Sequence, residues 1–218
     1  LDACLAGGVQ HVTVTSSGAA YGYYADNPQW ISETDRLRGN VEMPYADHKR
    51  QVEELLAGYR AQHPDLAQLI LRVGTVIGAG TRNLITNLFE KKRLLAIRGY
   101  DSPFVFIWDQ DLVGIISHGV ETGNGGIYNV AGDGCLTMDE LGQLLDKPVL
   151  KLPAPLIVAG LKIGRKLGLT RYAPEQIKFI QYRPVLDNRR LKEDFGYRPA
   201  KTSREAFLHF RDHGLRRR

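Results

Sequence analysis

The strongest constraint on the fold is the run AQLILRVGTVIG, residues 67–78, which is almost continuously apolar and ends at a cluster of glycines. In a strand with one face in water, apolar and polar residues alternate, because successive side chains point to opposite faces of the sheet. A run without that alternation predicts a strand covered on both faces, as in a parallel sheet. We therefore expect helices on both sides of a sheet that contains residues 67–78.

The segments before this run predict the rest of a βαβ unit. Residues 11–17 contain β-branched side chains and end in small polar ones, which predicts a strand, and a loop rich in turn residues follows over 21–44. Residues 45–62 predict a helix that ends before Pro64. Its apolar positions recur at helical spacing and its polar positions lie between them: Val52, Leu55, Leu56 and Tyr59, against Lys49, Arg50, Glu53 and Glu54. The order strand, loop, helix, strand predicts an α/β fold.

The remainder of the chain predicts further elements in a less regular order. The expected helices are residues 83–96, 109–121, 137–145 and 155–169, and the expected strands are 104–108 and 125–132. Thr137 and Glu140 have the spacing of a capping box, which marks a helix start. Asp109 and Asp111 lie in the first turn of their helix, where negative charge is favourable.

The predicted helix over residues 155–169, PLIVAGLKIGRKLGL, has two interpretations. In the first it is an amphipathic helix of a second domain, with Lys162, Arg165 and Lys166 on its wet side. In the second it lies on a membrane surface or against a hydrophobic substrate. The sequence leaves both interpretations open.

Composition excludes several classes of protein. No apolar run reaches the roughly 18 residues of a membrane span, and the opening LDACLAGGVQ does not resemble a secretory signal. Cys4 and Cys135 have no metal-binding spacing, so we expect free thiols, a cytoplasmic protein and no metal site. Part of the net charge of +5 lies in the final Arg216–Arg218. A nucleic-acid-binding protein would show a basic stripe with interleaved aromatic residues, and the sequence shows none, so we do not expect nucleic-acid binding. The chain begins with Leu1, which hints that the native N-terminus lies elsewhere.

The stretch MPYADHKRQVEELL places Tyr45 and Lys49 four residues apart, on one helix face and about one turn from each other. A free phenol is a poor base near neutrality, but a neighbouring cation favours its phenolate form. Tyr45 is therefore a candidate to exchange a proton with a carbonyl or carbinol oxygen. Ser17, at the end of the preceding predicted strand, is a candidate to hydrogen-bond the same oxygen. The spacing alone also fits one exposed turn of an ordinary helix, because such short motifs occur by chance.

The order of these segments resembles the extended short-chain dehydrogenases, the NAD-dependent epimerase/dehydratase group of sugar-nucleotide enzymes. The likeness covers nearly the whole chain. TSSGAAYG resembles the family's strand with a catalytic serine or threonine, and LILRVGTVIGAG resembles its LRPxNVYGPG. FVFIWDQDLVGII resembles FIHVDDVAxAI, GIYNVAG resembles xYNVGxG, and RPVLDNRRLKEDFGYRP resembles the family's closing segment.

The resemblance implies an NAD(P)-dependent oxidoreductase or epimerase that exchanges hydride at a hydroxyl or carbonyl carbon, on a nucleotide sugar or similar substrate. Tyr45 would be the acid/base, Lys49 would hold the nicotinamide ribose hydroxyls, and Ser17 would orient the substrate oxygen. The implied catalytic residues are thus Ser17, Tyr45 and Lys49. The implied binding residues are Ser16, Tyr45, Lys49, Thr75 and Val76 for NAD or NADP, and Ser17, Thr75 and Asn83 for the substrate.

The chain departs from the family at its start, because the glycine-rich GxxGxxG turn that seats the cofactor's pyrophosphate is not present. We therefore expect a partial Rossmann-like doubly wound sheet, with its C-terminal strands only, in residues 1–80. A smaller α/β substrate part is expected over 81–218, with 104–120 packing back on the sheet. The missing half either belongs to a longer protein or comes from another chain.

That departure also bears on partners and on function. The strand at 11–17 would leave a free sheet edge, which favours a homo-oligomer or other association through the sheet. The alternative to an enzyme is a non-catalytic binding or regulatory member, or a fragment that is inactive without its dinucleotide-binding half. Some sugar-nucleotide relatives have an arginine just before the FIHVDD strand, where this chain has Ser102 and Pro103.

Overall fold

Helices and parallel strands make up the computed structural model, which describes residues 1–170 and 173–215. The strands are β1 (His11–Ser17), β2 (Ala67–Val73), β3 (Thr75–Ile77), β4 (Leu94–Ile97), β5 (Phe106–Trp108), β6 (Gly126–Val130) and β7 (Val149–Leu152). The α-helices are α1 (Asp2–Ala6), α2 (Pro44–Gln62), α3 (Leu84–Phe89), α4 (Asp109–Thr122), α5 (Met138–Leu145), α6 (Ala154–Lys166), α7 (Ile177–Gln181), α8 (Arg189–Glu193) and α9 (Ser203–His213). Two 3-10 helices are η1 (Gly18–Tyr21) and η2 (Pro174–Gln176). In the described residues each of the four strand pairs is parallel, which confirms the α/β class.

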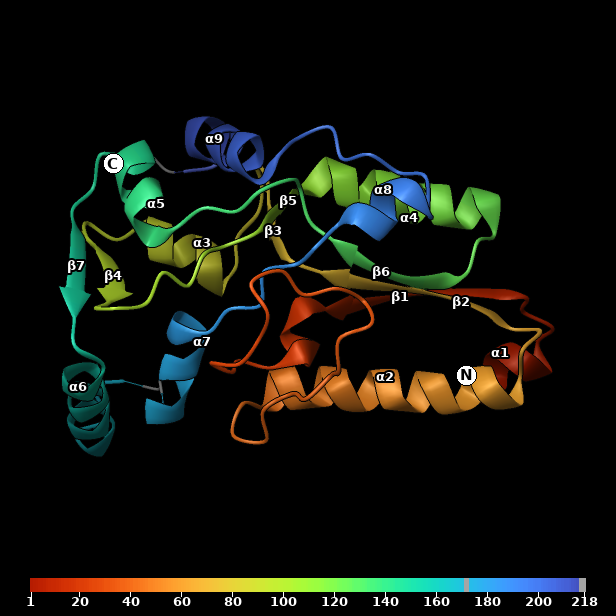
Figure 1. Cartoon of the computed structure of the whole chain (residues 1–218), viewed down its shortest axis with the longest axis horizontal. Coiled ribbons are helices and arrows are strands. Elements are labelled where there is room, and N and C mark those ends of the chain that lie inside the picture. The colour runs from red at the N-terminus through yellow and green to blue at the C-terminus, as the bar shows by residue number, and fades with distance from the viewer. Residues whose placement is uncertain (171–172, 216–218) are drawn as a thin grey trace.

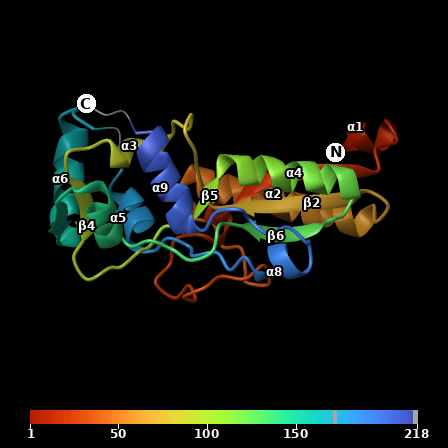
Figure 2. The same cartoon turned by 90° about the horizontal axis from the view of Figure 1, so that it is seen from above.

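The main sheet has the strand order β1-β2-β6 and lies between two helical layers. Its α2 helix covers one face, and α4 covers the other (Figure 1). Seen from the α4 side, that helix runs along the strands (Figure 2). The register pairs Ser17 at the end of β1 with Val73 at the end of β2, and Val73 with Val130. The carboxyl ends of all three strands therefore meet at one edge of the sheet, where open α/β sheets bind ligands.

The prediction of one strand over residues 67–78 was wrong, because the chain changes sheets at Gly74. Before that glycine, β2 pairs with β1 and β6; after it, β3 pairs with β5. A Cβ at Gly74 would lie 3.1 Å from the Val105 side chain and 3.3 Å from the Val130 carbonyl oxygen, so the crossing favours glycine. The absence of alternation was nevertheless a correct signal of burial, since Leu69, Ile70 and Leu71 are fully covered.

The prediction of a helix over residues 83–96 was correct only in its first half. The helix α3 ends at Phe89, and Leu94–Ile97 forms strand β4, which pairs in parallel with β7. The expected strand at 104–108 is shorter, because regular pairing begins at Phe106. The helices expected at 109–121, 137–145 and 155–169 are present as α4, α5 and α6, and Thr137 forms the expected capping box with Glu140. The division of the chain near residue 80 stays a prediction.

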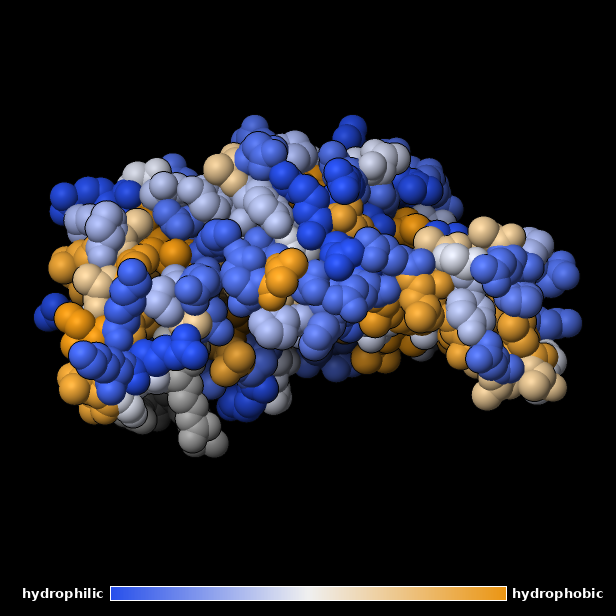
Figure 3. All heavy atoms as spheres, turned by 90° about the horizontal axis from the view of Figure 1, so that it is seen from below, coloured by the Kyte–Doolittle hydropathy of each residue, from blue (hydrophilic) through white to orange (hydrophobic). Residues whose placement is uncertain are grey.

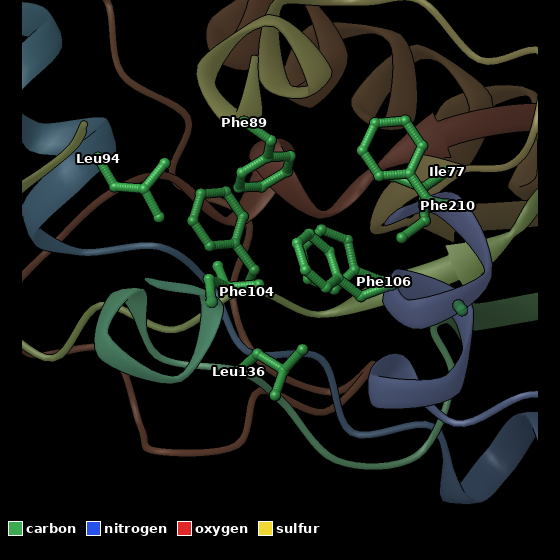
Figure 4. Close-up of a cluster of buried hydrophobic side chains, with 10 residues drawn as sticks. Ile77, Phe89, Leu94, Phe104, Phe106, Leu136 and Phe210 are labelled. Atoms are coloured by element: carbon green, nitrogen blue, oxygen red, sulfur yellow. The ribbon is translucent and has the colours of Figure 1, made fainter. Parts of the chain in front are cut away.

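An aromatic core joins β5 to α3 and α9. The ring of Phe89 lies 5.1 Å from that of Phe207, edge to face, and 5.7 Å from that of Phe104. These side chains are shown in part, with the neighbouring aliphatic residues, in Figure 4. Edge-to-face packing of this kind stabilises a core beyond the area it buries. The core therefore fixes the segment around residue 104 against the end of the chain.

The face that α2 buries differs from the prediction. Leu56 is buried as expected, but Val52 and Leu55 are exposed, and the carboxylate of Glu53 is buried in their place. A carboxylate is buried without large cost only when it is paired, and Arg72 on β2 supplies the partner, with Nη2 2.7 Å from Glu53 Oε2. A second acidic residue, Asp111 on α4, is buried because its carboxylate accepts from the backbone N–H groups of Ala200 and Lys201.

Candidate functional site

Tyr45 and Lys49 lie together at the start of α2. The helix begins at Pro44, whose fixed φ suits the first helical position. The Tyr45 side chain is 62% exposed, and Lys49 Nζ lies 5.8 Å from the centre of its ring. Lys49 Nζ also donates a hydrogen bond to the carbonyl oxygen of Thr15 at 2.9 Å. An ammonium group has three N–H donors, so this bond leaves two for other partners.

Ser17 lies at the carboxyl end of β1, two residues beyond the carbonyl that Lys49 contacts. Its Oγ accepts a hydrogen bond from the Ala19 backbone N–H at 3.2 Å and so caps η1. A hydroxyl that accepts in this way still has its own hydrogen to donate. The structure thus brings Ser17, Lys49 and Tyr45 to the same end of β1.

Ser16 points away from Ser17, as consecutive residues of a strand must. Its buried Oγ donates to Glu53 Oε1 at 2.5 Å, and Glu53 in turn binds Arg72 through two nitrogen atoms. Because β1, α2 and β2 each contribute one of these residues, the network fixes α2, with Tyr45 and Lys49, against the sheet. The Ser16 hydroxyl is thereby occupied inside the protein, and its predicted role in cofactor binding stays untested.

The same network extends into the long loop after η1. Arg72 donates to the hydroxyl of Tyr21, which donates in turn to Asn129 Oδ1 at 2.8 Å. Burial raises the pKa of Tyr21, so this phenol stays protonated. Glu33 accepts from the Asn129 backbone N–H at 2.7 Å, and burial raises the pKa of its carboxyl. These contacts hold the loop over the carboxyl edge of the sheet.

Thr75, Val76 and Asn83 lie around β3. Thr75 begins this strand and donates its N–H to the Val105 carbonyl oxygen at 3.2 Å. Asn83 caps α3, accepting from two backbone N–H groups, and its Nδ2 donates to the Val76 carbonyl oxygen at 3.3 Å. The amide of Asn83 therefore has a local structural role. The binding roles expected for Thr75, Val76 and Asn83 stay predictions.

No motif in the sequence indicates a functional role for Arg183, which follows α7. Its guanidinium carbon lies 3.6 Å from the centre of the Phe104 ring, and Nη1 donates to the Ser102 carbonyl oxygen. Nε and Nη2 are buried without a hydrogen-bond partner. The pKa of Arg183 falls to about 9 because burial disfavours the cation, although Tyr23 partly offsets this. An arginine thus does lie beside Ser102, but it comes from a distant part of the sequence.

Tyr23 connects Arg183 to the start of α2. Its ring packs against Phe179, 5.5 Å away, and against Ala46. Burial raises the pKa of Tyr23 to about 12; Arg183 opposes this shift and Tyr45 adds to it. Tyr23 is therefore within electrostatic range of both side chains. Through Tyr23, the buried guanidinium of Arg183 is thus connected to the start of α2.

The side chains present fit one end of a nicotinamide cofactor. Tyr45 is exposed, and Lys49 keeps two donors of the kind that bind ribose hydroxyls. Gly7 and Gly8 do not fit the phosphate end of the cofactor, because they come before β1, at its amino end, whereas dinucleotides bind at the carboxyl ends of strands. In the described ranges, His, Cys, Asp and Glu form no group of three or more able to hold a metal, and Cys4 and Cys135 are free thiols. None of the helices described is long and apolar enough to cross a membrane.

Comparison with known proteins identifies the family. The model described as "NAD dependent epimerase/dehydratase family" matches residues 1–131, more than half of the chain. This chain belongs to the NAD-dependent epimerase/dehydratase family. Uncharacterised proteins of Mycobacterium tuberculosis and Mycobacterium bovis are each 24% identical over 208 residues, which is 95% of this chain and 55% of theirs. The chain thus spans about half the length of the curated relatives it matches.

Several solved structures are similar in fold. MoeE5 in complex with UDP-glucuronic acid and NAD has a TM-score of 0.70 at 20% identity, over 98% of this chain and 66% of its own. The UDP-glucose 4-epimerase of Thermotoga maritima has a TM-score of 0.70 at 18% identity, over 97% and 65%. The dTDP-glucose 4,6-dehydratase of Bacillus anthracis, in complex with NAD, has a TM-score of 0.69 at 16% identity, over 97% of this chain and 63% of its own. The fold is therefore the Rossmann-like epimerase fold.

Proposed function

We propose that this chain carries the proton-transfer half of an NAD(P)-dependent site, which exchanges hydride at a hydroxyl or carbonyl carbon. The observation that carries the proposal is the position of Lys49, which contacts the Thr15 carbonyl oxygen and lies beside the Tyr45 ring. These two contacts support a site with a cation and a phenol at the end of β1, the strand that ends in Ser17. The family and its NAD-containing structural neighbours support the cofactor class.

In this proposal each of the three side chains has its own task. Tyr45 takes a proton from the substrate hydroxyl, or returns one to the carbonyl oxygen. The Ser17 hydroxyl donates a hydrogen bond to that oxygen, while its Oγ continues to cap η1. Lys49 keeps a positive charge beside the Tyr45 ring, and its remaining donors hold ribose hydroxyls. The nicotinamide cofactor, when bound, supplies the hydride chemistry.

We propose a nucleotide sugar or a similar anionic molecule as substrate. Neighbours of the same fold are described with UDP-glucose, UDP-glucuronic acid and dTDP-glucose chemistry, which supports this class. The buried N–H groups of Arg183 support it independently. Two of them have no hydrogen-bond partner in the described residues, and a guanidinium of this kind suits the phosphate or carboxylate of a ligand. In the described residues β1 pairs with β2 alone, and we further propose that the sheet continues beyond β1 in a longer protein, another chain or a second copy.

The test is turnover by the chain together with a dinucleotide-binding half, using Tyr45→Phe. We expect turnover by the variant to fall by about 10²–10⁴-fold and its cofactor affinity to be kept, since only the proton-transfer group is removed. Tyr59→Phe is the matched control, because this tyrosine lies on the same helix but bonds to Asp2. Equal turnover by Tyr45→Phe and Tyr59→Phe would overturn the proposed role.

The second candidate function is a binding or regulatory member of the family, or a chain that is inactive alone. The lack of a glycine-rich phosphate-binding turn in these residues favours it. Calorimetric titration of the 218-residue chain with NAD(H) and NADP(H) distinguishes a chain that binds the cofactor by itself from one that does not. We expect weak or no binding by the chain alone. Tight binding would show that its dinucleotide site is already whole.

A further inference from the structure

The α6 helix buries one apolar face against the rest of the chain. Ile157 is buried among Ile97 and Ile177, and Val158 and Leu161 pack beside it. These positions lie three and four residues apart, as the buried face of a helix requires. The contacts account for one side of α6 and fix its orientation.

A second apolar face of α6 points to solvent. Leu156 is 58% exposed, Ile163 60% and Leu167 65%. Ile163 follows Leu156 by seven residues and Leu167 follows Ile163 by four, so the three side chains line up along one side of the helix. Leu169, just after the helix, is exposed as well. A helix that is apolar on two opposite sides is typical of one with a partner on each side.

The charged residues of α6 itself all have one sign. The helix contains no aspartate or glutamate, and its cationic residues are Lys162, Arg165 and Lys166. Lys166 lies three residues after Ile163 and therefore next to it on the helix surface. Within the described ranges, Lys162, Arg165 and Lys166 are exposed and form no ion pair. The surface thus fits a partner that is both apolar and anionic.

The position of α6 favours a broad, flat partner. The helix lies at one extremity of the elongated molecule (Figure 1). The same end carries apolar and strongly hydrophilic side chains next to one another on its surface (Figure 3). A projecting helix of this composition suits the interface of a bilayer, where apolar residues enter the acyl boundary and cations meet headgroup phosphates.

We propose that α6 docks this chain on the surface of an anionic phospholipid bilayer. Leu156, Ile163 and Leu167 enter the interface, and Lys162 and Lys166 bind lipid phosphates. A second copy of the chain is a poorer partner, because a symmetric pairing of α6 would bring like charges together. The proposal concerns a surface on the far side of α6 from its protein contacts and does not depend on the proposed catalysis.

The test is flotation of the whole chain with vesicles, using phosphatidylcholine alone or with about 30% phosphatidylglycerol, a composition that supplies anionic headgroups. We expect binding to the anionic vesicles only, weakened at least about tenfold by raising the salt, because screening reduces surface attraction. The variant L156S/I163S/L167S and the variant K162E/K166E should each lose binding. The matched control V113S/V120S changes two side chains on α4 that are similarly exposed, 56% and 63%, and should bind as the wild type does.

Three outcomes would overturn the proposal. The first is the absence of flotation with anionic vesicles when the wild-type chain is folded by circular dichroism. The second is equal loss in the α4 control, which would mean that any exposed apolar residue suffices. The third is a reversible dimer, seen by sedimentation, that the variant L156S/I163S/L167S no longer forms, while neither the wild type nor the variant binds vesicles. That result would mean that the exposed face of α6 binds a second copy of the chain.

Discussion

Lys49 is joined to Thr15 across the space between α2 and β1, with its Nζ 2.9 Å from the carbonyl oxygen. The same Nζ lies 5.8 Å from the centre of the Tyr45 ring. One side chain therefore ties the candidate acid/base to the end of the strand that carries Ser17. The position of the cation is fixed by backbone, which does not change protonation state, so the arrangement is set before any ligand binds.

Removal of this cation should impair chemistry more than stability. We expect Lys49→Met to lower kcat/KM by about 10²-fold or more, because the proton-transfer step loses the positive charge beside Tyr45 and the cofactor loses a hydrogen-bond donor. Lys49→Arg should recover part of the loss. Arg50→Met, which removes the surface ion pairs to Asp47 and Glu54, is the control and should keep near-normal activity. A loss in Arg50→Met as large as that in Lys49→Met would contradict a specific role for Lys49.

The buried pair of Glu53 and Arg72 should dominate the local stability of α2. We expect Arg72→Met to lower the free energy of unfolding by about 3–5 kcal/mol, because it leaves a buried carboxylate unpaired. Arg38→Met breaks a pair whose Asp26 partner is largely exposed, and should cost at most about 1 kcal/mol. Urea unfolding of both variants checks the difference. Similar values for the two would show that the buried pair is not what holds the helix.

Glu33 should make stability depend on pH. Burial raises the pKa of its carboxyl in the folded state, so between the unfolded and folded values the folded chain holds more protons. The stability contributed by Glu33 therefore falls as the pH rises from the ordinary glutamate pKa of about 4.3 and stays low above the folded value. Glu33→Gln stays neutral, so its stability relative to the wild type should grow as the pH rises above the ordinary glutamate pKa of about 4.3. An advantage that shrinks with rising pH, by urea unfolding, would contradict this.

Arg183 should matter for substrate binding and little for folding. Its unpaired cation is costly inside the protein, so we expect Arg183→Met to be neutral or stabilising when no anion is bound. The same variant should raise KM for a nucleotide sugar by about tenfold or more, with kcat nearly kept. Arg93→Met, on an exposed side chain, is the control. An unchanged KM for an anionic substrate would remove Arg183 from the binding site.

The sequence predicted the elements whose signals are local. The β-branched run of β1, the periodic apolar residues of α2 and the capping box at Thr137 each lie within a few residues, and all three are present. The strand β4 was read as part of a helix because its pairing partner, β7, lies about fifty residues further along the chain. Strand propensity is weak evidence when the pairing partner is this distant.

The candidate site shows the same division between local and distant signals. Tyr45 and Lys49 are four residues apart on one helix, so their proximity follows from helical geometry alone. The burial of Glu53 depends on Arg72, and the position of Arg183 beside Ser102 depends on the packing of Phe104, and neither is encoded in a short motif. Distant contacts of this kind decide which polar groups are buried.

The most direct test of the central claim is a double-mutant cycle on single-turnover hydride transfer, with Ser17→Ala, Tyr45→Phe and the double variant. Both side chains are proposed to act on one substrate oxygen, so their effects should not add. We expect the double variant to be no more than about threefold slower than Tyr45→Phe alone, although Ser17→Ala by itself costs at least about tenfold. Losses that multiply in full would mean that Ser17 and Tyr45 act separately, and would contradict the account.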